Sequence, residues 1–268
     1  MKAGDLTTLA NVKAWLNTGA PDAFPTTDDA LLARMITAAS NFAKSWLSRD
    51  LIPTDYTLTL NGNGGIQIFM PQYPIISVSA VSVGGTAASP RTVGQPYSTG
   101  YFFDSQSIYN NGVGFPNGLQ NINISYSAGF QVNNETVTVP TTPFQLAVSS
   151  LGRTWTIDRG VTLANGTAMV KVAATPAAGQ YAVIAVDGVW VYQFNTADAN
   201  AAILISYGYC PDDLEEALIE LIGERYKTRE RIGQTSKHIK DQTVSYSQKD
   251  FNAFITDVFN QLKNVVPL

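Results

Sequence analysis

The residue types that most often carry out chemistry in proteins are scarce in this chain of 268 residues. His238 is the only histidine and Cys210 the only cysteine. His238 stands in the polar stretch Ser-Lys-His-Ile-Lys-Asp without a second histidine or a cysteine nearby, so neither an ordinary zinc site nor a serine–histidine–aspartate triad is supported. Cys210 has no partner for an internal disulfide, which favours a reducing compartment of assembly. Beside a proline it is typical of a small packing residue.

Other motifs that resemble catalytic or binding sites have simpler structural explanations. Carboxylates occur in adjacent pairs at positions 28 and 29, 212 and 213, and 215 and 216. Neighbouring residues of a helix point in different directions, so these pairs do not form general acid–base couples. The glycine-rich stretch at 61–65 precedes no helical pattern, which indicates a hairpin turn rather than a phosphate-binding loop. We therefore predict no catalytic residue, no metal site and no cofactor, and we do not expect an enzyme.

Composition and charge narrow the class of protein. The formal net charge is −4 and the pI is near 5.0, which argues against a protein that coats nucleic acid. The N-terminus has no apolar core and no long apolar run follows, so we expect neither a signal peptide nor a membrane span. Residues 56–202 carry only nine charged side chains in 147 positions. Interface cores are depleted in charge, so this region suits contact with neighbours, although an ordinary uncharged β domain would look the same.

Helical patterns occur at both ends of the chain, over residues 7–18, 27–48, 212–231 and 250–264. The second pattern begins at Thr27, a suitable N-cap, and its apolar residues recur at helical spacing. In the third, acidic residues come first and basic residues follow, as the helix dipole favours. The fourth is amphipathic and must pack on the other helices or on a neighbouring subunit.

The middle of the chain is β-rich. Residues 55–128 contain alternating and β-branched segments, and residues 131–202 contain short strands at about 8–12-residue spacing, the signature of a small β-sandwich or barrel. The pattern Ile-x-Ile-Ser-Tyr occurs twice, at 122–126 and 203–207, and the second copy leads into the third helix. We interpret 131–202 as an inserted module that carries its own version of this strand. Chance resemblance between two short strands is the alternative.

The predicted fold is α+β. A bundle of about four helices from both ends of the chain is expected to combine with the β-rich middle. The predicted domains are a core of residues 1–130 plus 203–268, which includes the β region 55–128, and an inserted sandwich-like or barrel-like β module of residues 131–202.

The order of these patterns resembles a known family. The stretches LTTLANVKAWL, TTDDALLARMITAASNFAKSWLSRDL and GIQIFMPQYPIISVSAVSV follow one another as in the head–tail connector (adaptor) family of tailed bacteriophages and prophages. The later stretch ISYGYCPDDLEEALIELIGERYKTRERIGQTSK is similar to that family's exit strand and arginine-rich helix. The resemblance covers most of residues 6–130 and 203–268. The module at 131–202 departs from the short members and looks like a β module that recurs in phage structural proteins.

The resemblance implies a structural virion protein at the head–tail interface, assembled in the cytoplasm of a bacterial host. Members of this family form a ring, usually of twelve subunits, beneath the portal protein. The ring extends the DNA channel and provides the platform for a stopper, tail-terminator or tail protein. Phage DNA is then expected to pass through without sequence-specific binding, and no membrane contact is expected.

Two sets of contact residues follow from this resemblance together with charge and periodicity. The basic set is expected to meet acidic surfaces of the portal or a neighbour, or to line the channel near DNA, unless it is only a solvated helix face. It comprises Arg225, Lys227, Arg229, Arg231, Lys237 and Lys240. The apolar set is expected to dock on the portal or an adjacent subunit, and comprises Phe251, Phe254, Phe259 and Leu262.

A rival interpretation is a tail-completion or baseplate protein whose β module binds a receptor or a glycan. Trp155, Tyr181, Trp190 and Tyr192 would then stack on a sugar, although aromatic residues at such spacing more often belong to a core.

Overall fold

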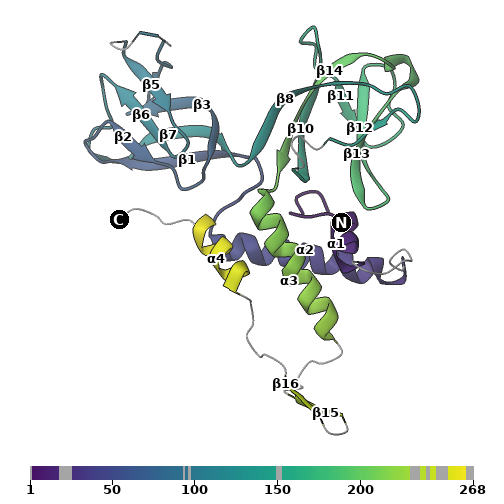
Figure 1. The fold of residues 1–268 in the computed structure, drawn as a ribbon. Helices are drawn as coiled ribbons and strands as arrows, with labels where there is room; N and C mark the ends of the chain where they lie inside the picture. Colours follow the sequence, from purple (N-terminus) through teal and green to yellow (C-terminus); the bar gives the residue numbers. More distant parts are fainter. Residues whose placement is uncertain are drawn as a thin grey trace.

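The protein combines a layer of helices with two β units that stand on one side of it (Figure 1). The computed structural model describes residues 2–17, 26–92, 94–95, 98–148, 153–229, 236–239, 242–245 and 253–263. The predicted α+β fold is confirmed. The helices are α1 (Leu9–Leu16), α2 (Asp29–Leu47), α3 (Asp212–Thr228) and α4 (Ala253–Leu262), with 3-10 turns η1 (Thr26–Asp28) and η3 (Thr196–Asp198).

The helices share one apolar core because each buries an amphipathic stripe. α2 buries Leu32, Ile36 and Ala43 at helical spacing, and the buried face of α3 packs against them. α1 and α3 approach closely at Gly223, where a Cβ would lie 2.0 Å from Cζ3 of Trp15. Glycine is therefore the residue that this crossing accepts. The bundle brings both ends of the chain together, as the sequence predicts.

The segment before and within α1 ties the bundle to the second β unit described below. The backbone N–H of Gly4 donates to the carbonyl of Thr156 at 2.8 Å. The side-chain amide of Asn11 donates to Thr154 at 3.1 Å and to Glu215 of α3 at 2.7 Å. Glu215 is only 7% exposed, so these hydrogen bonds satisfy a carboxylate that burial would otherwise penalise.

Two β units lie between α2 and α3, and we call residues 54–128 the first β unit and residues 131–209 the second β unit. The first contains β1 (Thr54–Gly62), β2 (Gln67–Phe69), β3 (Ile75–Val83), β4 (Thr86–Ala88), β5 (Gly100–Phe103), β6 (Ser107–Asn111) and β7 (Gly118–Ala128). The second contains β8 (Gln131–Thr138), β9 (Gln145–Leu146), β10 (Trp155–Leu163), β11 (Val170–Val172), β12 (Gln180–Val186), β13 (Val189–Phe194) and β14 (Ala202–Tyr209). After α3, β15 (Ser236–Ile239) pairs with β16 (Gln242–Ser245).

Each β unit has its own sheets and its own core. The first unit has sheets of order β1-β7-β3-β4 and β2-β6-β5, and the second has β10-β14-β8 and β11-β12-β13-β9. Alternation along the central strands turns one face inward, so Ile122 and Ile124 are fully buried in the first unit and Ile203 and Ile205 in the second. The two units therefore fold around separate apolar clusters.

Strand pairing adjusts the boundary predicted for the inserted module. The second Ile-x-Ile-Ser-Tyr segment lies in β14, which pairs with β8 and β10. By hydrogen bonding, the second unit thus extends to Tyr209 rather than to residue 202. The division of the chain into a connector core and a module otherwise remains a proposal.

Candidate interaction surfaces

The first basic residues of α3 are exposed but lie over aromatic rings of the bundle. The guanidinium carbon of Arg225 is 5.7 Å from the centroid of the Phe42 ring. Nζ of Lys227 is 4.5 Å from the centroid of the Trp15 ring. Contacts of this kind stabilise exposed sites by about 0.5–1 kcal/mol each. These side chains therefore hold helices together and still present positive charge to solvent.

Arg229, at the end of α3, is tied to the start of α2. Its guanidinium carbon lies 3.9 Å from the centroid of the Tyr226 ring, and Nη2 is 3.5 Å from a carboxylate oxygen of Asp28. The Tyr226 hydroxyl donates to the same carboxylate, and this hydrogen bond raises the pKa of the tyrosine. The basic end of α3 is thus positioned by an ion pair and a ring contact.

The remaining basic residues of the predicted set are placed less fully. Lys237 belongs to β15, and the structure gives its backbone alone. Arg231 and Lys240 lie outside the described residues. A contact role for the basic set stays a prediction.

The apolar set of α4 divides into buried and exposed members. Phe259 is 1% exposed, and its ring centroid lies 6.1 Å from those of Phe42 and Trp46. It is part of the chain's own core, and its docking on a portal or neighbour stays a prediction. Phe254 is 43% exposed and Leu262 is half-buried at the edge of the core, while Phe251 lies outside the described residues.

Sequence reasoning missed an exposed apolar surface on the first β unit. We call it the apolar surface and define it by its three most exposed side chains, Ile66, Val113 and Leu119. Phe69 and Phe103 are also exposed, but they lie on opposite faces of the sheet β2-β6-β5, because Phe69 pairs with Ser107 and Phe103 with Ile108. Leu119 is 86% exposed and Val113 74%. Cγ2 of Ile66 lies 3.7 Å from the point where a Cβ of Gly114 would stand, so the loops that carry Ile66 and Val113 are neighbours. The low charge of residues 56–202 predicted a contact region in the sequence, but it did not identify these individual side chains.

Several of the few charges in the β units are engaged within the chain. Asp158 accepts hydrogen bonds from the hydroxyls of Tyr181 and Tyr192 at 3.0 Å each, and pairs with Lys171 at 2.9 Å. Burial and then the charge of Asp158 raise the pKa of both tyrosines, so they stay neutral donors. Because Asp158 and Lys171 interact with each other, they add little net charge to the surface of the second β unit.

The aromatic residues of the rival glycan site lie in the core of the second β unit. Trp155, Tyr181 and Tyr192 are each at most 5% exposed, and Trp190 packs against Trp155 with ring centroids 5.2 Å apart. The adjoining cavity, lined in part by both tryptophans, measures about 140 Å³, below the roughly 300 Å³ at which ligand pockets begin. Burial therefore removes the rings of Trp155, Tyr181 and Tyr192 from the surface where a sugar would stack, whereas Trp190 is only partly buried.

Cys210, one of the residues first considered for chemistry, has an ordinary packing position. Cys210 is fully buried between β14 and α3, and burial raises the pKa of its thiol well above the ordinary value. A buried neutral thiol behaves as a small apolar residue, as predicted. Within the described residues, no three histidine, cysteine, aspartate or glutamate side chains gather as metal ligands would. None of the helices in that part of the chain is long and apolar enough to cross a membrane.

A helical bundle that supports charge-poor β units with exposed apolar side chains is suited to a structural protein that contacts neighbours. Comparison with known families agrees: the sequence model of the head completion protein family matches residues 5–151. The chain therefore belongs to the head completion protein family.

Solved structures of gene transfer agent particles contain similar chains. One comes from the neck of an empty particle computed with C6 symmetry: it is 13% identical, with a TM-score of 0.43, over 100% of this chain and 95% of that one. Another comes from the virion of a native particle: it is 13% identical, with a TM-score of 0.44, over 100% of this chain and 94% of that one. No curated protein matches the chain.

Proposed function

We propose that this head completion protein forms a closed ring of twelve copies beneath the portal and extends the DNA channel. The ring provides the platform to which a stopper, tail-terminator or tail protein attaches. The ring thus forms part of the DNA channel and connects the portal to the tail, a role that requires no catalysis. One observation carries the proposal: the apolar surface lies exposed on a β unit that carries almost no charge.

An exposed apolar surface of this kind fits contact between copies of one chain. Large apolar side chains at the surface and depletion of charge are features of interface cores. A ring of identical subunits uses head-to-tail contacts, in which one face of a subunit meets a different face of the next. The apolar surface supplies one such face, and the ring closes when the rotation between subunits completes a circle.

The apolar surface can be tested by adding charge to it. We expect Val113→Lys with Leu119→Lys to abolish oligomers in mass photometry, because two ammonium groups would be desolvated at the subunit contact. Both side chains are exposed in the single chain, so the free energy of unfolding should change by less than about 0.5 kcal/mol per site. Thr136→Lys, at an exposed polar position of β8, is the matched control. Intact oligomers in the double variant would contradict this role of the surface.

The basic end of α3 is the proposed contact with acidic portal or neighbour surfaces, or with DNA in the channel. Arg225→Glu with Lys227→Glu should prevent tail attachment while filled heads persist, because the variant repels an acidic partner. Arg225→Gln with Lys227→Gln loses the same ring contacts without reversing charge. It should retain most attachment, which separates recognition from helix packing. Normal yields of infectious particles from the glutamate variant would exclude this contact.

A further inference from the structure

The two β units have the same strand order. In the first unit the central strand β7 lies between β1 and β3, and in the second the central strand β14 lies between β8 and β10. The other sheets also correspond, because β2-β6-β5 in the first unit follows the same chain order as β9-β13-β12 in the second. Figure 1 shows the units side by side above the bundle, each with its own pair of sheets.

The correspondence extends to the register of individual residues. β3 pairs with β7 from Ile75↔Ala128 to Val83↔Ile122, and β10 pairs with β14 from Trp155↔Tyr209 to Leu163↔Ile203. Strand β3 is thus repeated as β10 after 80 positions, and the central strand after 81. Both β3 and β10 are interrupted by two bulges, and these also recur after 80 positions. The first pair leaves residues 76 and 79 unpaired, and the second leaves 156 and 159.

The strands next to these sheets repeat as well. β4 pairs with β3 from Val81↔Ala88 to Val83↔Thr86. In the second unit the stretch 167–169 takes the same place, because the N–H of Met169 donates to the carbonyl of Val161 at 2.9 Å. The parallel bridge of Tyr101 to residue 90 has its counterpart in the pairing of β12 with β11 at Tyr181. Two β-bulges at matching places in unrelated strands would be an improbable coincidence, since bulges are specific features of a fold.

We infer that residues 54–128 and 131–209 are tandem copies of one β unit, and that Arg159 of the second copy fixes the angle between them. The family match ends at residue 151 and so includes the first copy and only the start of the second. The repeated Ile-x-Ile-Ser-Tyr segments are the central strands of the two copies. This inference does not depend on ring formation.

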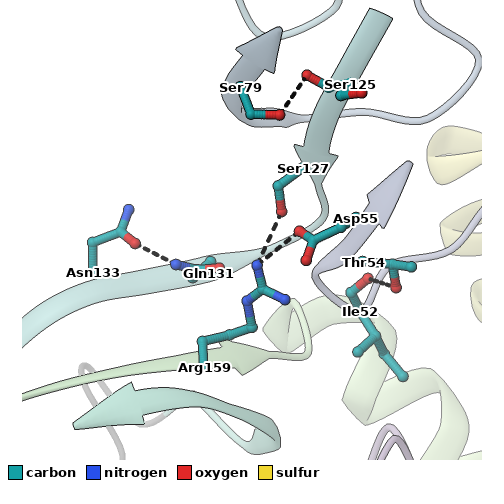
Figure 2. A network of polar contacts seen from close by, with 9 residues as sticks. All are labelled: Ile52, Thr54, Asp55, Ser79, Ser125, Ser127, Gln131, Asn133 and Arg159. Atoms are coloured by element: carbon teal, nitrogen blue, oxygen red, sulfur yellow. Dashed lines mark hydrogen bonds and ion pairs between the residues drawn. The ribbon is translucent and has the colours of Figure 1, made fainter. Parts of the chain in front are cut away.

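Arg159 stands at the bulge position that Ser79 occupies in the first copy (Figure 2). The Ser79 hydroxyl donates to the carbonyl of Ser125 within its own unit at 3.0 Å. Arg159 instead reaches the first unit, where Nη2 donates to the carboxylate of Asp55 at 2.9 Å and to the hydroxyl of Ser127 at 3.3 Å. One side chain therefore bridges the ends of β1 and β7 to β10.

The residues around this bridge form the joint between the copies. The backbone N–H of Tyr209 donates to the carbonyl of Phe130 at 3.0 Å, and their rings meet edge to face at 5.8 Å. Gly208 faces Pro53, whose Cδ would lie 2.5 Å from an added Cβ. These contacts hold the linker ends together, while Arg159 supplies the polar tie between the sheets themselves and so limits their rotation.

The test measures the distance between the units in the full chain. Nitroxide labels at Ala87→Cys and Ala185→Cys mark exposed sites of the first and second units, and Cys210 is buried from the reagent. We expect a narrow distance distribution by double electron–electron resonance in the labelled chain. With Arg159→Ser it should be about twofold broader, since a partly exposed ion pair makes a modest tie. An unchanged distribution with Arg159→Ser would overturn the role of Arg159.

The reciprocal substitution Ser79→Arg tests the duplication. If position 79 is the counterpart of 159, its side chain points away from the core and accepts arginine without loss of thermal stability or broadening of the distances. If circular dichroism and hydrogen exchange show that Ser79→Arg unfolds the first unit, the correspondence is overturned. The variant at position 159 tests the role of Arg159, and the variant at position 79 tests the duplication. The two parts of the inference can therefore fail separately.

Discussion

At the scale of single residues, the joint between the β units depends on Arg159 and Asp55. Asp55 is largely exposed, at 72% of its side chain, whereas Arg159 is 27% exposed. Exposed pairs contribute little to global stability, about 0–1 kcal/mol. The pair is therefore better suited to set an orientation than to hold the fold together.

The protonation of Asp55 reports directly on this pair. The hydrogen bond from Arg159, followed by that from Ser127, lowers the pKa of the Asp55 carboxyl below its ordinary value. The stabilisation it contributes is present above the ordinary aspartate pKa and is lost as the pH falls through the lowered one. We expect Arg159→Ser to raise the pKa of Asp55 toward its ordinary value in a carboxyl NMR titration. An unshifted Asp55 in that variant would show that the pair does not persist in solution.

At the scale of elements, each β unit is an apolar cluster closed around one central strand. Ile124 of β7 and Ile205 of β14 are both fully buried at matching positions. Because their cores are separate clusters, damage to one unit should leave the other folded.

Matched substitutions test this independence. Ile124→Ala and Ile205→Ala should each destabilise their own unit by about 2–5 kcal/mol, the usual range for such a cavity. Hydrogen exchange should then rise within residues 54–128 for the first variant and within 131–209 for the second. Equal loss of protection in both units from either variant would show a single cooperative β core instead.

Elements with a strong local period were the ones that the sequence predicted well. The stripe from Leu31 to Leu47 has helical spacing, so α2 follows from local pattern alone. The pairing of β14 with β8 joins residues about seventy positions apart, and no local pattern specifies such a partner. This is why the sequence pattern did not group β14 with the strands of the second unit.

The contact residues were harder to predict than the fold. An amphipathic stripe shows that a face will be covered but not by what, and so Phe259 was assigned to a partner although the bundle itself covers it. Exposed apolar residues such as Leu119 follow no core period, because their partner is absent from the single chain. Charge depletion marked the region, and only the folded structure separates its inner from its outer side chains.

At the scale of the whole molecule, the bundle and the two β units form separate blocks that present different surfaces. The bundle offers the basic end of α3, and the first β unit offers the apolar surface. A chain with two unlike faces on a firm support is suited to head-to-tail assembly around an axis. The central claim is therefore that copies of this protein complete one another in a ring at the head–tail interface.

Electron microscopy of the purified full chain, alone and mixed with purified portal, tests that claim most directly. The account predicts closed rings whose subunits surround a central channel and which stack on one face of the portal. Single, unassembled chains in both samples, together with virions that lack this polypeptide, would contradict it.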